Sequence, residues 1–384
     1  MTRNTFTQFA SKLKPLGQLD HPREMIRQFT PNWFAATMGT GILALALPQV
    51  PGAGSTLHAI GEGLWLFNIF LFTLFSVLYT ARWVMFWDEA MRIFSHNIVS
   101  MFVGTIPMGL ATIINGFLMF GLPRWGNDMI AVAQILWWLD VAMSLACGVL
   151  IPYFMFTRQA HGIDKMTAVW LLPIVAAEVA AVSGGLLIPH LSDTHTQYLT
   201  LIASYVLWAY SVPVAFGILT ILFLRMALHR LPPDSMAASS WLSIGPIGTG
   251  ALGMIVLGGD APAILAAQGM ANIGMVAEGI GTIAGILLWG VGLWWLLLAS
   301  LITIRYFRAG VPFNLGWWGY TFPLGVYTVT TLKLGVLLKI AAFSGFGTVL
   351  VCVLAVMWLL VAARTIHGGW KGHLFVSPCI AVIN

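Results

Sequence analysis

The segment WWGYTFPLGVYTVTTLKLG contains two residues that membrane helices usually avoid, a central proline, Pro323, and a lysine, Lys333. Phe322 immediately precedes the proline, where the backbone bends and can aim a side chain away from the regular helical track. A ring at such a bend can block a narrow passage and swing aside. Alternatively it only packs, as most of the 23 phenylalanines of this chain are expected to do.

Lys333 follows Phe322 by eleven residues, which is three helical turns, so both side chains lie on nearly the same helix face about 16 Å apart at 1.5 Å per residue. A fixed cation beside a water-filled passage would lower the cost of taking an anion out of water and would reject cations. The alternative is a lysine near a helix end that extends its ammonium to the membrane interface.

Glu178 stands in the middle of the apolar stretch PIVAAEVAAVSGG, where a charge costs at least ~2.5 kcal/mol. The carboxyl is therefore expected to be neutralised by burial or paired with a cation. A protonated Glu178 could carry a proton together with an anion, which would make the protein a symporter. The alternative is a structural carboxyl that hydrogen-bonds a broken helix. Asp140 lies on a different span and is expected to contact another helix or subunit.

Small polar side chains on the odd-numbered apolar spans, which are listed below, could hydrogen-bond a carboxylate or an oxyanion, or could satisfy nearby backbone groups. We include six of them in a candidate substrate pathway: Asn32, Thr40, Thr105, Asn115, Thr249 and Thr321. The nine histidines and three cysteines show no metal-ligand spacing, and no phosphate-binding or nucleophile motif occurs in a plausible context. We therefore predict no metal, no cofactor and no catalytic residue.

These residues are embedded in a chain that is 59% hydrophobic and only 8% charged, against about 25% charged residues in soluble domains. Such a composition predicts an all-α polytopic membrane protein. The basic residues follow the loops of one membrane side, so the net charge of +5 implies no nucleic-acid partner. Ten apolar runs have spanning length: 30–50, 59–82, 97–120, 129–156, 167–189, 197–224, 237–257, 274–303, 313–338 and 341–363.

Lysine and arginine are concentrated in the N-terminal segment, in alternate loops and after the last span, which predicts that both termini are cytoplasmic and that the chain lies in the cell inner (plasma) membrane. We therefore divide the chain into a cytoplasmic arm, a ten-helix transport domain and a cytoplasmic tail: 1–28, 29–366 and 367–384.

Prolines recur at intervals of 66, 73 and 77 residues on the odd-numbered spans: Pro107, Pro173, Pro246 and Pro323. The repeat predicts five helical hairpins. A proline inside a helix costs ~3 kcal/mol unless the freed carbonyl finds a partner, and in a membrane water can supply it only beside a water-filled passage. We therefore expect the odd helices to be kinked and to line a central pore, with the even helices outside. The alternative is that these residues serve helix packing alone.

Two motifs carry a resemblance to a known family. FTPNWFAATMGTGILALAL (29–47) and FNLGWWGYTFPLGVYTVTTLKL (313–334) make the chain similar to the tellurite-resistance/dicarboxylate transporter family, which includes slow-type anion channels, malic-acid transporters and sulfite exporters. The resemblance extends over nearly the whole chain. It implies a homotrimer in which each protomer has its own pore, blocked midway by a phenylalanine of the ninth helix, which in this sequence is Phe322.

The resemblance thus assigns the gate to Phe322 at Pro323, and we expect two residues without side chains beside the ring, Gly39 and Gly41. It implies transport of small anions, with C4-dicarboxylates of the malate type ranked first. Sulfite, tellurite-like oxyanions or chloride are the alternatives within the same fold. An intramembrane enzyme that uses Glu178, Asp140 and histidines is less favoured, because these groups are scattered over different depths.

Overall fold

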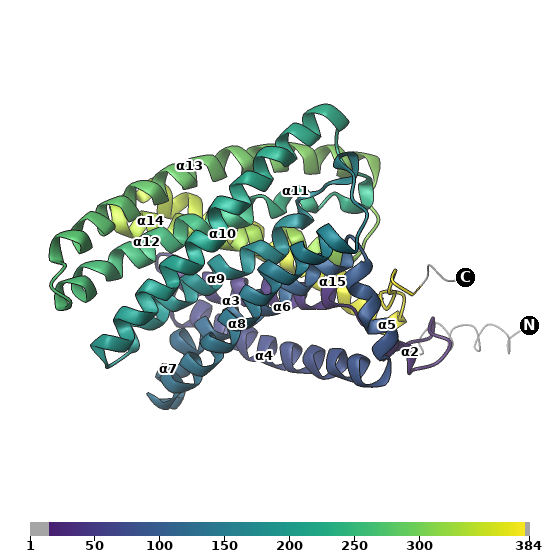
Figure 1. Ribbon diagram of the computed structural model, residues 1–384, viewed down its shortest axis with the longest axis horizontal. Helices are drawn as coiled ribbons and strands as arrows, with labels where there is room; N and C mark the ends of the chain where they lie inside the picture. The colour runs from purple at the N-terminus through teal and green to yellow at the C-terminus, as the bar shows by residue number, and fades with distance from the viewer. Residues whose placement is uncertain (1–14, 381–384) are drawn as a thin grey trace, which may run out of the picture.

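The computed structural model describes residues 15–380, and every regular element in this part of the chain is helical (Figure 1). Nine helices in this part are long and apolar enough to cross a membrane. They correspond to the second to tenth predicted spans. The first predicted span is a shorter, fully helical run that consists of η1 (Pro31–Phe34), α3 (Ala35–Ala46) and η2 (Leu47–Gln49). The expected all-α membrane fold is confirmed.

The helices fall into two groups, which we call inner and outer. The inner helices are α3, α6 (Thr105–Gly116), α9 (Leu172–Leu187), α12 (Ile244–Ala267) and α14 (Phe322–Leu338). The outer helices are α4 (Gly54–Met85), α8 (Asp128–Thr157), α10 (Thr194–His229), α13 (Ala271–Ala309) and α15 (Ala341–Lys371).

Short elements connect them: α2 (Glu24–Arg27), α5 (Trp87–Met91), η3 (Arg92–Ser95), η4 (Val99–Gly104), η5 (Phe117–Gly121), α7 (Leu122–Trp125), η6 (Ile163–Lys165), η7 (Ala168–Leu171), η8 (Ile188–His190), η9 (Asp234–Met236), α11 (Ser239–Leu242) and η10 (Leu315–Tyr320).

Burial separates the two groups as the sequence predicted. In the apolar part of the span Ala168–His190, which contains α9, 94% of the residues are buried, whereas only 17% are buried in Gly54–Met85. All twelve residues of α3 are buried. The outer helices expose bulky apolar side chains such as Phe70, Leu287 and Leu359. Small residues are therefore on the helices that protein surrounds, and bulky apolar residues are on those that face lipid.

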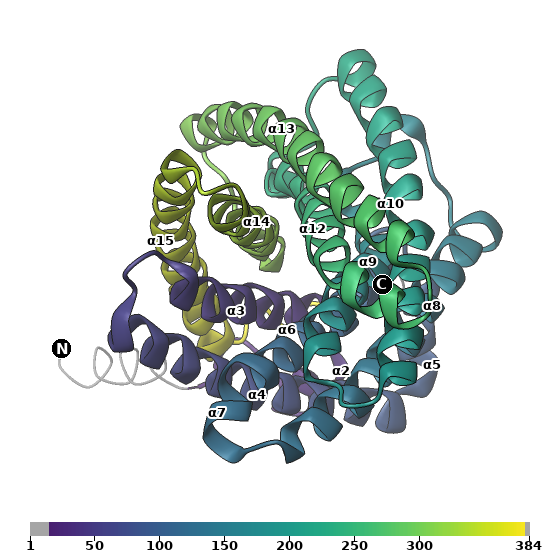
Figure 2. The ribbon, with the colours of Figure 1, turned by 90° about the vertical axis from the view of Figure 1, so that its left-hand side faces the viewer.

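The inner helices form a closed ring, in which α3 contacts α6, α6 contacts α9, α9 contacts α12, α12 contacts α14, and α14 returns to α3. Figure 2, which looks along the bundle from the end opposite α2 and α5, shows this ring inside the outer helices. Each outer helix packs against the inner helix that precedes it and against the next one around the ring. This order is what five successive hairpins around one axis would give.

The repeated prolines occupy different positions from those expected. Pro173 and Pro323 stand in the first turns of α9 and α14, and Pro107 and Pro246 are the third residues of α6 and α12. A proline in a first turn lacks an N–H that would have no intrahelical partner anyway. The prolines therefore stand near the starts of α-helices and not in the helix interiors where the sequence placed them. The inner spans are instead interrupted before the proline, where a short helical lead-in such as η4, η7 or η10 precedes the α-helix.

Close helix packing makes Gly104 sensitive to substitution. A Cβ atom on Gly104 would lie 2.3 Å from the backbone oxygen of Leu172, so the clash involves a backbone that cannot rotate away. We expect Gly104→Ala to lower the free energy of unfolding by about 1–3 kcal/mol, the usual cost of overpacking, and to lower the melting temperature in detergent. Gly217→Ala is the control, because no heavy atom lies within 4 Å of its added Cβ. Equal melting temperatures for both variants would contradict this account of the contact.

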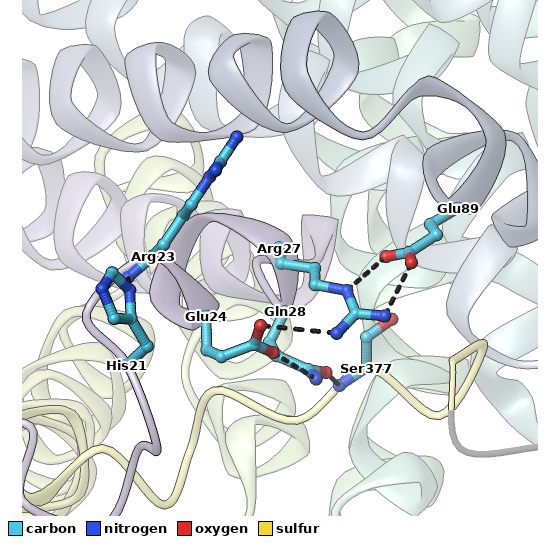
Figure 3. Close-up of polar contacts among 7 residues, drawn as sticks. All are labelled: His21, Arg23, Glu24, Arg27, Gln28, Glu89 and Ser377. Atoms are coloured by element: carbon cyan, nitrogen blue, oxygen red, sulfur yellow. Dashed lines mark hydrogen bonds and ion pairs between the residues drawn. The ribbon is translucent and has the colours of Figure 1, made fainter. Parts of the chain in front are cut away.

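The arm and the tail are bound to one another at one end of the bundle (Figure 3). Arg27 donates to both carboxylate oxygens of Glu89 at 2.7 Å. The backbone N–H of Ser377 donates to Gln28 at 2.8 Å, and the buried guanidinium of Arg82 donates to the Phe29 carbonyl and the Ser377 hydroxyl. The last helix continues to Lys371, five residues beyond the expected boundary of the transport domain. Residues 1–14 of the arm and 381–384 of the tail lie outside the described residues.

The Arg27–Glu89 pair makes attachment of the arm depend on pH. The guanidinium of Arg27 holds the pKa of Glu89 below its usual value, because it donates hydrogen bonds to the ionised carboxylate. A lowered folded-state pKa stabilises the attached state above the unfolded-state value of about 4.3, and this contribution is lost as pH falls through the folded-state pKa. We expect amide hydrogen exchange of residues 24–28 to increase in that acid range. In Glu89→Gln the acid-dependent increase should disappear; its persistence would assign it to another group.

Candidate functional site

A cavity of about 340 Å³ opens at the end of the bundle where the described chain begins and ends, at residues 15 and 380; we call it the termini-side cavity. Its wall includes the starts of α3, α6, α9 and α14, together with α11, and its mouth is lined by the tail residues His373, Leu374, Val376 and Pro378. The tail thus contributes to the entrance. Gly372, at φ +92°, ends α15 and turns the chain back across this end of the bundle.

A second cavity, of about 330 Å³, lies toward the opposite end of the ring; we call it the far-side cavity. All five inner helices contribute side chains to its wall, among them Leu45, Asn115, Val182, Thr249 and Val329. The ring of inner helices therefore encloses space at both ends, rather than a continuously filled core.

Phe322 alone among the described residues lines both cavities. Its ring is 3% exposed, so it fills the constriction between them. Thr321 precedes it in a non-helical link between η10 and α14, and Pro323 follows in the first turn of α14 and lines the termini-side cavity. The break in the helix therefore places the phenylalanine side chain on the axis of the ring that the inner helices form.

Lys333 lines the far-side cavity, as expected from its spacing to Phe322, and its side chain is exposed. Two further polar side chains at this end were missed from the sequence, Gln49 and His190. Each belongs to the short 3₁₀ turn that follows an inner helix, η2 and η8. Their position at the far ends of odd-numbered spans, at the same level as Lys333, was the signal that could have identified them.

Asn115 and Thr249 also line the far-side cavity. The Asn115 Oδ1 and the Thr249 Oγ1 have no hydrogen-bond partner among the described residues. Buried polar atoms are rarely left without a partner, so such groups indicate a place where water or a solute completes the hydrogen bonding. The Thr249 hydroxyl can donate to an oxyanion, and Asn115 can do so through its Nδ2, whereas its Oδ1 can only accept a hydrogen bond, for example from water.

Asn32 and Thr105 line the termini-side cavity. The Asn32 Oδ1 lacks a partner among the described residues, whereas the Thr105 hydroxyl is shared between the carbonyls of Pro31 and Phe102, at 3.0 and 2.7 Å. His373 stands at the mouth, where burial lowers its pKa, and the nearby charges of His367 and Lys371 act in the same direction. The sequence did not predict this histidine, because only the fold of the tail brings it to the entrance.

Neither cavity is lined by an aspartate or a glutamate within the part of the chain that the structure describes. The ionisable groups on their walls are basic: Lys333, His190 and His373. Lys333 provides positive charge, and the other polar side chains provide hydrogen-bond donors, while no acidic side chain of the described residues lines either wall. Such a wall therefore favours an anion over a cation, because charged and dipolar groups along a pore select the ion that passes.

Glu178 is fully buried but does not line either cavity. Its Oε2 accepts a hydrogen bond of 3.2 Å from Ser211 on α10, and the same hydroxyl donates to the carbonyl of Ile174 at 2.8 Å. The carboxyl thus joins an inner helix to an outer one. This location favours the structural alternative over a place in the substrate pathway.

Four other expected site residues also face helix contacts instead of the cavities. A Cβ on Gly39 would lie 2.2 Å from Thr321 Oγ1, and one on Gly41 would lie 2.0 Å from Thr112 Oγ1. Thr40 accepts a hydrogen bond from the indole of Trp358 at 3.0 Å, and Thr321 donates to the carbonyl of Trp318 at 2.7 Å. The two glycines therefore allow α3 to approach its neighbours closely, and neither lines a cavity beside Phe322.

The described residues contain no cluster of three or more histidine, cysteine or acidic side chains that could hold a metal ion. Asp140 is buried on α8, and neither of its carboxylate oxygens has a hydrogen-bond partner among the described residues. It lies on an outer helix, as expected, and lines neither cavity.

Comparison with known proteins agrees with this geometry. A sulfite efflux pump of Arthroderma benhamiae is 38% identical over 353 residues, which cover 91% of this chain and 93% of that protein. An uncharacterized transporter of Methanocaldococcus jannaschii is 28% identical over 92% of this chain and 96% of its own. The malic acid transport protein of Schizosaccharomyces pombe is 24% identical, over 88% of this chain and 78% of its own.

Residues 28–366 match the family described as SLAC1, voltage-dependent anion channel. This range begins at the end of the arm and ends within α15, so it contains all five inner helices and the whole far-side cavity, whereas the tail residues at the mouth of the termini-side cavity lie beyond it. These matches show that the chain is a membrane protein that conducts or transports anions, and that it is not an enzyme. The chain belongs to the SLAC1 family of voltage-dependent anion channels.

Proposed function

We propose that each protomer conducts sulfite across the membrane through the axis of its inner ring, with Phe322 as the gate. The observation that supports this proposal best is the pair of cavities on that axis, whose walls bear no acidic side chain in the described residues and which share only Phe322. Lys333 attracts the anion into the far-side cavity. In the same cavity the Thr249 hydroxyl and the Asn115 Nδ2 can donate hydrogen bonds to the oxygens of an anion that has passed the gate.

The proposal ranks sulfite ahead of the C4-dicarboxylates that the sequence ranked first. Relatives named for sulfite efflux are up to 38% identical to this chain, whereas the relative named for malic acid transport is 24% identical. Sulfite is also the smaller anion, and each cavity narrows to a constriction that a single phenylalanine ring fills.

We also propose that the protein lies in the plasma membrane with both chain termini in the cytoplasm. Its support is the positive-inside rule, since basic residues such as Arg82, Arg308 and Lys371 stand in the last turns of helices that end on the termini side. Sulfite then leaves the cell from the termini-side cavity to the far-side cavity. We further propose a homotrimer, in which three such pathways act independently because each uses the helices of one chain.

Transport by the purified chain in liposomes tests this function. We expect sulfite loaded inside the liposomes to leave down its gradient without ATP, faster than from protein-free liposomes. In the reverse assay, which measures uptake of labelled sulfite, unlabelled external sulfite should compete more strongly than malate or chloride at equal concentration. Stronger competition by malate would shift the assignment to dicarboxylates. No flux of any of the three anions, even through a variant without the gating ring, would exclude the proposed function.

A further inference from the structure

An apolar cleft of about 310 Å³ lies between α4 and α15, outside the ring of inner helices. One wall is formed by α4, through residues such as Phe67 and Leu78, and the other by α15, through residues such as Trp358 and Ile366. Its base includes Trp318 of η10 and Thr40 of α3. The cleft thus lies where the first and the last hairpin of the chain meet.

The length and the position of the cleft match one leaflet of a bilayer. From Phe67 to Leu78 the wall on α4 spans eleven residue steps, which is about 16 Å at 1.5 Å per residue. One half of a bilayer hydrocarbon core is about 15 Å thick. The lining continues at the termini side to Phe29, Trp33 and Trp370. The cleft therefore extends from the middle of the membrane to the interface on the side of the chain termini.

Trp33 provides a second, independent observation at the interface end. Its ring lines the cleft and is 5% exposed, yet its Nε1 has no hydrogen-bond partner among the described residues. Other buried indoles of this protein do have partners; for example, those of Trp65 and Trp137 donate to carbonyls at 3.1 and 2.9 Å. A tryptophan at the interface end of an apolar cleft is suited to donate to a lipid ester or phosphate oxygen.

We infer that the cleft binds one phospholipid of the termini-side leaflet, with an acyl chain between α4 and α15 and an ester or phosphate oxygen at the indole N–H of Trp33. Lys371, the last residue of α15, adds a positive charge near the same end. The acyl chain would pack against Trp318, whose indole N–H donates to Thr365 of α15 at 3.1 Å. The lipid would thereby complete the packing between the hairpins that contain the two ends of the chain.

Photo-crosslinking with a phosphatidylcholine that carries a diazirine on one acyl chain tests this site. In liposomes of this lipid, we expect labelled peptides to concentrate on residues 67–78 and 358–370. Ala362→Trp places a large ring in the cleft, because Ala362 lines it. It should lower this labelling by about tenfold, which corresponds to about 1.4 kcal/mol of binding free energy. Ala363→Trp is the matched control, since the next residue is exposed and lies outside the cleft.

A second variant decides the question if Ala362→Trp does not fold. Trp33→Phe keeps an aromatic ring against Phe29 and Phe375 but removes the indole N–H. Native mass spectrometry should then show less retained phospholipid per protein chain than in the wild type. Labelling spread evenly over the exposed faces of α8, α10 and α13 would overturn the proposal. So would cross-links that join the cleft residues to a second copy of the chain.

Discussion

Replacement of Phe322 by alanine will raise the steady anion flux by about tenfold or more, which corresponds to a barrier lower by about 1.4 kcal/mol. The ring is the one described side chain that lines both cavities. Its removal should join them and allow water to enter the constriction, and a hydrophobic constriction blocks ions largely by excluding water. The measurement is anion current, or uptake into liposomes at equal protein content.

Phe102→Ala is the matched control for this experiment. Phe102 lines the termini-side cavity but not the far-side cavity, and it is 7% exposed, similar to the gate residue. Its truncation should widen one cavity without joining the two, and flux should stay close to that of the wild type. If the two variants behaved alike, or if Phe322→Ala left the flux unchanged, Phe322 would be a packing residue and the gate would have to be elsewhere.

Neutralising Lys333 will depress the flux of divalent anions more than that of monovalent anions. Removal of a fixed charge that contributes about 1 kcal/mol per unit of anion charge at an intermediate effective dielectric lowers monovalent occupancy about 5-fold and divalent occupancy about 30-fold. Lys333→Gln keeps a long polar side chain on the wall of the far-side cavity. The measurement compares sulfite and chloride fluxes at alkaline pH, where sulfite is mostly the dianion, in the Phe322→Ala background, in which the gate does not limit either rate.

Lys339→Gln is the charge-matched control, because this exposed lysine ends α14 outside both cavities. It should leave the selectivity between divalent and monovalent anions unchanged. Lys333→Arg should keep the selectivity that Lys333→Gln loses. An equal loss of divalent and monovalent flux in Lys333→Gln would show that the lysine serves only to anchor the helix end at the membrane interface.

The sequence predicted the arrangement of helices well because the bilayer imposes strong constraints. Spans must be long and apolar, and helices that face lipid can carry bulky residues such as those of α13, whereas helices enclosed by protein need small ones. Proline and glycine on alternate spans therefore separated the inner from the outer helices. The common helix face of Phe322 and Lys333 followed from the helical repeat alone, and the structure places both on the wall of the far-side cavity.

Rotation of each helix about its own axis was harder to predict. Thr249 and Thr40 are alike in sequence context, both being small polar residues among glycines, yet Thr249 faces a cavity and Thr40 faces Trp358 of the last helix. Glu178 also faces an outer helix. No periodicity distinguishes these cases, because most residues of the inner helices are buried whichever way they face.

Contacts between distant segments were likewise not visible in the sequence. The tail reaches the entrance because Ser377 binds Gln28 and Arg82, residues more than 290 positions away in the chain. The repeated prolines marked the right places along the chain but for a different reason. Since each stands at the start of an α-helix, it indicates where the lead-in ends rather than where a helix bends.

The central claim, that Phe322 alone separates two water-filled cavities, is tested most directly by thiol accessibility. In a background in which Cys147, Cys352 and Cys379 are alanine, cysteine is introduced at Thr249 in the far-side cavity or at Ser239 in the termini-side cavity. A membrane-impermeant anionic methanethiosulfonate is then applied to intact cells from outside. We predict that Thr249→Cys is modified whether residue 322 is phenylalanine or alanine. Ser239→Cys should be modified only when Phe322→Ala is also present. Modification of Ser239→Cys with the ring intact, or protection of both sites, would contradict the account.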